Sequence, residues 1–139
     1  MKKYKIGYTQ GTYDLFHVGH LNLLKHAKEQ CDYLIVGVNS DSLVEEYKNK
    51  KTHINEKDRA EIVNSIKYVD KVYITKTLDK KLIFDQIKFD AIFIGDDWKG
   101  NARWEKTQED FSKVGVDVVF LPHTDGISTT LITQKIDSK

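Results

Sequence analysis

The stretch YKIGYTQGTYDLFHVGH, residues 4–20, combines a short apolar run, a glycine turn and the beginning of a helix-length segment. Tyr4 to Tyr8 is rich in aromatic and β-branched residues, which favours a strand. Val18 to Gln30, after the turn, carries apolar or small residues at regular spacing, including Leu24 and Ala27, which is typical of an amphipathic helix. This stretch therefore predicts a strand, a turn and a helix in succession.

The same alternation continues along the chain. Further strand-like apolar runs are Tyr33 to Val38, Val69 to Ile74, Ala91 to Ile94 and Val116 to Leu121. The helix-length segments are Ser42 to Tyr47, Glu56 to Ile66, Asp79 to Ile87, Ala102 to Lys113 and Thr129 to Ile136. Asn55 is expected to be the N-cap of the second of these segments. Strands that alternate with helices pair in parallel through right-handed crossovers. The sequence predicts an α/β fold with an open doubly wound, Rossmann-like, five-stranded parallel sheet, as one domain over residues 1–139.

Composition excludes several classes of protein. Lys and Arg total 22 against 21 for Asp and Glu, so a net charge of +1 provides no field that attracts nucleic acid or membrane surfaces. A lone Cys31 cannot form an internal disulfide, and no apolar run approaches the ~20 residues of a membrane span. Residues 1–3 lead into the first strand without the apolar region of a secretion signal. We therefore expect a cytoplasmic protein without nucleic-acid or membrane partners.

The first turn has the features of a phosphate site. In doubly wound sheets ligands bind beyond the carboxyl ends of the strands, and a glycine turn beside a helix N-terminus presents free backbone N–H groups to an anion. His17 and His20 are three positions apart, so both imidazoles can face the same way, and Gly19 between them allows close approach of a ligand. Two alternatives remain at this point: half of a zinc site, although further Cys or His ligands at zinc spacing are missing, and two solvated or capping histidines.

Residues 11–20, GTYDLFHVGH, match every fixed position of the G-[TS]-[FY]-D-x-x-H-x-G-H signature of the HxGH nucleotidyltransferase superfamily, which the chain resembles. Residues 126–130, GISTT, resemble its second signature, R-T-E-G-I-S-T-T. Residues 95–98, GDDW, and 67–70, KYVD, look like elements of its cytidylyltransferase family. The resemblance covers essentially the whole chain. It implies transfer of CMP from CTP to a small phosphorylated alcohol, with glycerol-3-phosphate the leading acceptor, giving CDP-glycerol and pyrophosphate.

The resemblance also implies roles for individual residues. The residues implied in catalysis are His17, His20, Lys48 and Ser128. Those implied in nucleotide binding are Gly11, Thr12, Tyr13, Asp14, Gly19, Asp97, Trp98, His123, Thr124, Gly126, Ile127, Ser128 and Thr129. Those implied in binding the acceptor phosphate are Lys48, Lys50, Arg59 and Lys67. Asp14 is expected to orient its neighbours rather than to attack.

The family pattern further implies Mg²⁺ bound through the nucleotide phosphates, with no metal ligand from the protein, and a homodimer that serves teichoic acid or capsule synthesis. A phosphomonoester is mostly ionised near neutral pH, since its second pKa is ~6, so no strong general base is required. Catalysis then depends on alignment of the phosphates and neutralisation of their charge.

Departures from the family pattern leave alternatives open. His123 stands where the second signature has Arg, Asp125 where it has Glu, and Lys67 where the closest relatives often have Arg. Phosphocholine, phosphoethanolamine or another polyol phosphate therefore stays open as the acceptor. An adenylyltransferase of the same superfamily is a rival, against which residues 95–98 argue. A non-catalytic nucleotide-binding module is another, against which the intact histidines, Ser128 and Thr129 argue.

Overall fold

The computed structural model describes residues 2–124 and 129–137, and its five strands form one parallel sheet. The strands are β1 (Tyr4–Gly11), β2 (Cys31–Asn39), β3 (Lys71–Thr75), β4 (Ala91–Gly95) and β5 (Asp117–Leu121). Their order in the sheet is β3-β2-β1-β4-β5, and each neighbouring pair is parallel. The chain builds one half of the sheet outward from β1, then crosses to the other side of β1. This order confirms the predicted doubly wound α/β fold.

Each predicted helix is also present. The helices are α1 (Val18–Gln30), α2 (Asp41–Lys48), α3 (Glu56–Asn64), α4 (Lys80–Ile87), α5 (Ala102–Ser112) and α6 (Thr129–Asp137). A short 3₁₀ turn, η1 (Asp96–Trp98), was not predicted. The strand bounds differ most at the end of β1, which continues to Gly11 rather than stopping at Tyr8. The polar residues there stay in the ladder because β1 is central, and β2 runs on beside it, pairing with Gly11 through Val38.

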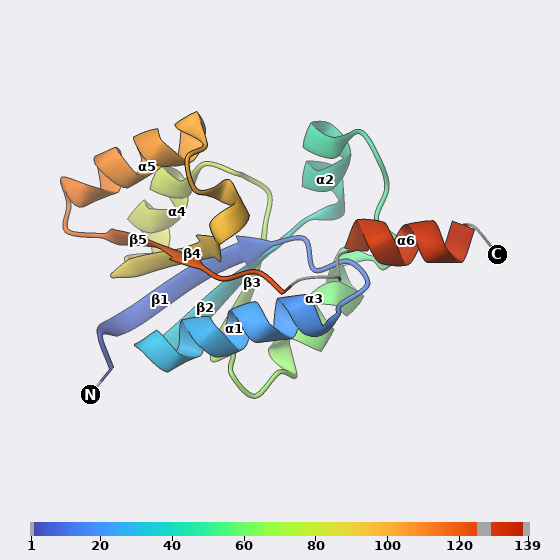
Figure 1. Ribbon diagram of the computed structural model, residues 1–139, viewed down its shortest axis with the longest axis horizontal. Helices are drawn as coiled ribbons and strands as arrows, with labels where there is room; N and C mark the ends of the chain where they lie inside the picture. Colours follow the sequence, from blue (N-terminus) through green and yellow to red (C-terminus); the bar gives the residue numbers. More distant parts are fainter. Residues whose placement is uncertain (1, 125–128, 138–139) are drawn as a thin grey trace.

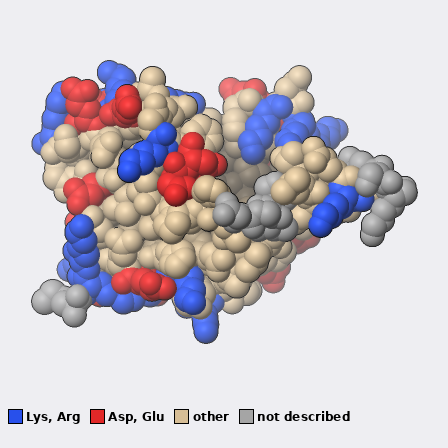
Figure 2. Space-filling model, viewed as in Figure 1, with Lys and Arg blue, Asp and Glu red and all other residues tan. Residues whose placement is uncertain are grey.

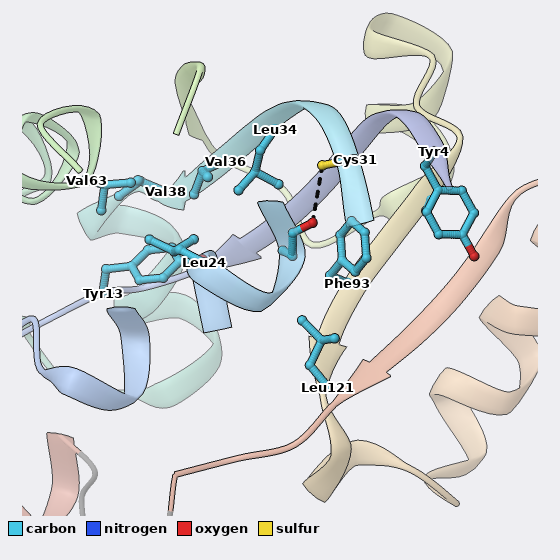
Figure 3. Close-up of a cluster of buried hydrophobic side chains, with 12 residues drawn as sticks. Tyr4, Tyr13, Leu24, Cys31, Leu34, Val36, Val38, Val63, Phe93 and Leu121 are labelled. Atoms are coloured by element: carbon cyan, nitrogen blue, oxygen red, sulfur yellow. Dashed lines mark hydrogen bonds between the residues drawn. The ribbon is translucent and has the colours of Figure 1, made fainter. Parts of the chain in front are cut away.

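The helices cover both faces of the sheet (Figure 1). On one face α1 and α3 pack over a core that includes Leu24, Val36 and Phe93, all almost fully buried (Figure 3). On the other, α4 and α5 contribute Ile83 and Phe111 to a second core. Full burial of one side chain such as Leu24 contributes about 1.5–3 kcal/mol, so both faces stabilise the sheet. The described residues include no helix with the length and apolarity to cross a bilayer.

Hydrogen-bonding caps place the turns at the carboxyl edge of the sheet. Ser40, directly after β2, begins α2 by accepting a hydrogen bond from the Leu43 backbone. Asn55 begins α3 by accepting one from Asp58, as the sequence predicts for that helix. Since all five strands are parallel, their carboxyl ends share one edge, and α6 lies beyond that edge in Figure 1. The polar turns that follow the strands are therefore brought together.

Candidate active site

A cavity of about 830 Å³ opens at the carboxyl edge of the sheet, between the β1–α1 turn, α2 with the loop after it, the start of α4, and α5. Figure 2 shows a hollow there, with Lys and Arg side chains gathered at its rim beside α2. The positively charged residues among the described lining are Lys48, Lys50, Lys51, Lys80, Lys81, Arg103 and Lys106. A chain with a net charge of only +1 thus concentrates positive charge in one concave site, which favours a polyanionic ligand.

The two signature histidines form the N-terminal cap of α1. Gly19 N donates to His17 Nδ1 at 3.0 Å, and His17 N donates to His20 Nδ1 at 3.2 Å. This is a reciprocal capping box in which two imidazoles replace the usual hydroxyl and carboxylate. Because both Nδ1 atoms accept hydrogen bonds, each neutral ring carries its proton on Nε2, which is a donor. The rings stack with centroids 3.8 Å apart, so they share one orientation, as predicted.

Electrostatics keep this histidine pair neutral. Burial lowers the pKa of His20 to about 3, with the nearby charges of His17 and Lys48 acting in the same direction and Asp14 opposing them. Burial also lowers the pKa of His17. At neutral pH both rings therefore offer N–H donors without charge, and the positive charge of the site comes from its lysines. His20 lines the cavity, whereas His17, whose ring stacks on that of His20, is not among the described lining residues.

The Asp14 carboxylate joins the signature turn to the loop before α3. It is almost fully buried and accepts hydrogen bonds from His53 N at 2.9 Å, His53 Nδ1 at 3.0 Å and Ile54 N at 3.0 Å. Burial alone raises the pKa of Asp14, but these hydrogen bonds outweigh it and hold the pKa below its ordinary value. Its carbonyl accepts from Thr129 Oγ1 at 2.7 Å, which ties the first residue of α6 to the turn. Asp14 is placed to orient other groups.

Arg59 corrects one expectation. Its side chain is 0% exposed, and its guanidinium donates to the carbonyls of Ile54, Thr12 and Asn39 and to Asp41 Oδ1, at 2.6 to 2.8 Å. Thr12 directly follows β1, Asn39 ends β2 and Ile54 precedes α3, so one guanidinium joins three segments of the chain. Arg59 is therefore an internal clamp and is not placed to bind the acceptor phosphate. The resemblance to the family had implied a contact with the acceptor phosphate.

Lys67 corrects a second expectation, whereas Tyr13 combines a core position with a place in the cavity lining. Tyr13 is 4% exposed and its ring points into the core beside Leu24 (Figure 3), where it also packs edge-on against His20 with centroids 5.3 Å apart. Its ring therefore supports the histidine that lines the same cavity. Lys67 is exposed, follows α3 and precedes β3, so it lies toward the amino ends of the strands and is not among the described lining residues. In this chain it is not placed to bind the acceptor phosphate.

The remaining predicted residues that the structure describes divide into two sets. Those that line the cavity are Gly11, Thr12, Asp14, His20, Lys48, Lys50, Trp98 and Thr129. Those that are described but do not line it are His17, Gly19, Asp97, His123 and Thr124. Gly126, Ile127 and Ser128 lie outside the described residues.

Local contacts explain three of these positions. His123 Nδ1 pairs with Asp96 Oδ1 at 2.6 Å, which places a histidine and carboxylate pair beside η1 where the family pattern has Arg. Thr124 Oγ1 accepts from Asn22 Nδ2 at 2.9 Å. Trp98 is 48% exposed at the rim, so its indole face is available to a base rather than committed to the core.

The structure adds lining residues that the motifs did not single out. Lys80 at the start of α4 lies over Trp104 of α5, with Nζ 5.9 Å from the ring centroid, and burial lowers its pKa to about 8. Tyr47 of α2 and Asn39 at the end of β2 form a hydrogen-bonded group with Thr12. Tyr47 could have been noticed as the direct neighbour of Lys48. Lys80 and Trp104 come together only through the packing of α4 on α5.

Several known proteins are similar to this chain over nearly its full length. The chain is 41% identical to glycerol-3-phosphate cytidylyltransferase of Bacillus spizizenii over 94% of its length and 95% of the relative's. It is also 41% identical to the Staphylococcus aureus enzyme of that name, over 94% of each chain. A FAD synthase of Thermococcus kodakarensis is 38% identical over 91% of this chain and 87% of its own length.

A solved structure and a family profile give the same answer. The crystal structure of a lipopolysaccharide core biosynthesis protein from Thermoplasma volcanium superposes with a TM-score of 0.75 at 25% identity, over 88% of this chain and 99% of that one. The profile of the cytidylyltransferase-like family matches residues 8–135, which include the histidine cap and all the described residues that line the cavity. The chain belongs to the cytidylyltransferase-like family and is a nucleotidyltransferase.

Proposed function

We propose that this protein transfers CMP from CTP to glycerol-3-phosphate, giving CDP-glycerol and pyrophosphate. The observation that carries the proposal is the capping pair of neutral histidines at the mouth of a lysine-lined cavity, in a chain whose relatives include enzymes named for this reaction. The cavity volume of about 830 Å³ is in the range of pockets that enclose a small-molecule ligand. A nucleotide and a three-carbon phosphate are ligands of that class.

The chemistry requires alignment and charge neutralisation rather than proton removal. An oxygen of the acceptor phosphate attacks the α-phosphorus of CTP, a new P–O bond forms, and the bond from the α-phosphorus to the oxygen bridging to the β-phosphorus breaks. Pyrophosphate leaves with that electron pair. The acceptor phosphate is already mostly a dianion at neutral pH, because its second pKa is ~6. Neutral imidazole donors and lysine ammonium groups suit this reaction, and the site needs no strong base.

Each group then has a place in the proposal. The Nε2–H donors of His17 and His20 bind triphosphate oxygens and stabilise the charge that moves toward the leaving pyrophosphate. Lys48, the last residue of α2, and Lys50, in the loop after it, bind the acceptor phosphate. Thr12 and Thr129 line the cavity beside the signature turn, where Thr129 Oγ1 donates to the Asp14 carbonyl and holds the start of α6 against the turn. Gly126, Ile127 and Ser128, which precede α6 in the sequence, are assigned to the triphosphate as well.

Recognition of the base is assigned to the β4 side of the cavity. The exposed face of Trp98 is offered for stacking on cytosine. Asp97 or the backbone beside it accepts from the cytosine amino group, which distinguishes an amino from a keto substituent. His123 carries less of the phosphate contact than an Arg would, since its ring is shorter and is paired with Asp96.

Magnesium enters the proposal with the nucleotide. Among residues 2–124 and 129–137 no group of three or more His, Cys, Asp or Glu is gathered in a way that could hold a metal. Both oxygens of Asp14, the carboxylate nearest the signature turn, are already hydrogen-bonded. The lysines of the site bind the phosphates, and the phosphate oxygens in turn would be the ligands of Mg²⁺. Mg²⁺ bound in this way would neutralise part of the triphosphate charge.

We further propose that the protein acts in the cytoplasm as a homodimer and that its product supplies teichoic acid or capsule synthesis. Support for a second copy comes from β3, an edge strand whose Tyr73 and Ile74 are 45% and 39% exposed. An edge strand with exposed apolar side chains is a surface that proteins usually cover.

One assay tests the reaction. Each of CTP, ATP, GTP and UTP is combined with glycerol-3-phosphate, phosphocholine, phosphoethanolamine or a sugar phosphate, and pyrophosphate release is measured with Mg²⁺ present. The proposal expects release from CTP with glycerol-3-phosphate, and none when the acceptor is omitted. Reaction with ATP alone would replace it with an adenylyl transfer. Nucleotide binding without reaction in any combination would favour a non-catalytic module.

A further inference from the structure

A chain of side-chain hydrogen bonds at the carboxyl edge has a direction that one backbone carbonyl sets. A terminal atom of Gln10 lies 3.0 Å from Thr77 O, and a carbonyl can only accept, so this atom is the amide nitrogen Nε2. The same nitrogen donates to Asn39 Oδ1 at 2.8 Å. Gln10 Oε1 accepts from Tyr8 Oη at 2.8 Å, which agrees with that orientation. The Asn39 amide therefore has its Nδ2 hydrogens directed away from Gln10.

Asn39 uses that nitrogen to hold two hydroxyl groups. Nδ2 lies 3.2 Å from Thr12 Oγ1 and 3.2 Å from Tyr47 Oη, and the two hydroxyl oxygens are 3.1 Å apart. Each hydroxyl accepts from Asn39, and one of them donates to the other. Within this triad the two hydroxyls have two hydrogens, and one is used between them. The other O–H is left to donate to a group outside the triad.

Tyr47 is the better of the two donors. A phenol is a stronger acid than an aliphatic alcohol, and a hydroxyl that accepts two hydrogen bonds donates more strongly. Tyr47 is 40% exposed on the cavity wall, in the last turn of α2. Lys48 Nζ lies 5.5 Å from the Tyr47 ring centroid, so positive charge stands beside the hydroxyl-bearing ring. Thr12 then donates to Tyr47, and the Tyr47 O–H donates to the ligand.

The position of Tyr47 points to the acceptor substrate rather than to the triphosphate. Val44 and Tyr47 of α2 line the cavity, and α2 lies on the same side of the sheet as α4 and α5 in Figure 1. The histidine cap belongs to α1, on the opposite face (Figure 1). Tyr47 therefore lies on the same side of the site as Lys48, its neighbour in α2, and the loop that follows α2.

We propose that the Tyr47 hydroxyl donates a hydrogen bond to a phosphate oxygen of the acceptor, with Thr12 and Asn39 as the residues that position it. Lys48 Nζ lies beside the Tyr47 ring and Lys50 lines the same cavity, and a hydroxyl donor with two ammonium groups matches a phosphomonoester dianion. This inference rests on the proposed cytidylyl transfer and names a residue that selects its second substrate.

The test removes one oxygen atom. Tyr47→Phe keeps the ring and its contact with Lys48 but loses the donor, and Tyr33→Phe, at an exposed tyrosine of β2 that is not among the described lining residues, is the matched control. KM and kcat are measured for CTP and for glycerol-3-phosphate, with thermal midpoints to confirm folding. A hydrogen bond to a charged group predicts a rise of about tenfold or more in KM for glycerol-3-phosphate in the Tyr47 variant. Its KM for CTP should stay within about twofold of wild type, as should both KM values of the control.

The outcomes separate this inference from the proposed function. Wild-type turnover together with an unchanged acceptor KM in Tyr47→Phe overturns the inference alone. Equal rises in the KM values of both substrates overturn the assignment to the acceptor. Absence of CTP turnover with glycerol-3-phosphate in the wild type overturns the proposed function and, with it, this inference.

Discussion

Acidification from pH 7 to pH 5 should destabilise this protein through His20. Its pKa is about 3 in the folded state because burial disfavours the charged ring, with His17 and Lys48 adding to the effect against Asp14. In the unfolded chain the pKa is near 6.5. Below pH 6.5 His20 is therefore protonated in the unfolded state but stays neutral in the folded state. Stability that is complete above pH 6.5 is lost progressively as the pH falls toward 3.

The size of the effect follows from those two pKa values. At pH 5 the unfolded ring is about 1.5 pH units below its pKa, and each unit corresponds to about 1.36 kcal/mol. His20 alone should therefore lower the free energy of unfolding by about 2 kcal/mol between pH 7 and pH 5. His17, whose pKa burial also lowers, acts in the same direction. For a domain whose total stability is in the usual range of about 5–15 kcal/mol, the change is large.

Urea unfolding at pH 7, 6 and 5 measures this change directly. His20→Gln is the informative variant, because a Gln at this third position of the helix can still accept from His17 N and complete the capping box without titrating. It should lose most of the pH dependence between 7 and 5. His26→Gln, at a half-exposed position on the same helix, is the control and should keep it. A wild-type free energy of unfolding that is constant over this range, or an undiminished slope in His20→Gln, would refute the neutral buried pair.

Three further predictions follow from the site. His17→Ala should lower kcat in the pyrophosphate assay by about 100-fold, the usual cost of one transition-state donor, while circular dichroism shows a folded protein. Arg59→Met should lower the free energy of unfolding by about 3–5 kcal/mol in urea titrations, because Asp41 and three carbonyls lose a buried partner. Lys67→Ala should leave kcat/KM within about twofold of wild type, whereas Lys48→Ala should reduce it by about tenfold or more. Equal losses in the two lysine variants would contradict the placement of Lys67.

The sequence predicted the layout of the fold because the pattern is local. Apolar runs and amphipathic segments alternate without interruption, and that alternation has one common solution, a parallel sheet with helices on both faces. Cap residues such as Asn55 located a helix start to the residue. The end of β1 was missed because Thr9 to Gly11 owe their strand conformation to pairing with β2, a long-range contact that local composition does not report.

The site was predicted less completely, for a physical reason. Motif spacing identifies which residue occupies a position but not what its side chain faces. Arg59 matches the family motif and is an internal clamp, and Tyr13 matches it and packs into the core. The directed pair of neutral histidines required the capping geometry, and the Tyr47 triad required three separate segments to meet. These properties arise from packing and hydrogen-bond direction, which emerge only when the chain is folded.

The most direct test of the central claim is a crystal structure of the protein with CTP and Mg²⁺. We expect the triphosphate to lie in the cavity at the carboxyl edge of the sheet, beside the first turn of α6. Its oxygens should lie about 3 Å from Nε2 of His17 and His20. Triphosphate density elsewhere, with both imidazoles directed away from it, would contradict the account.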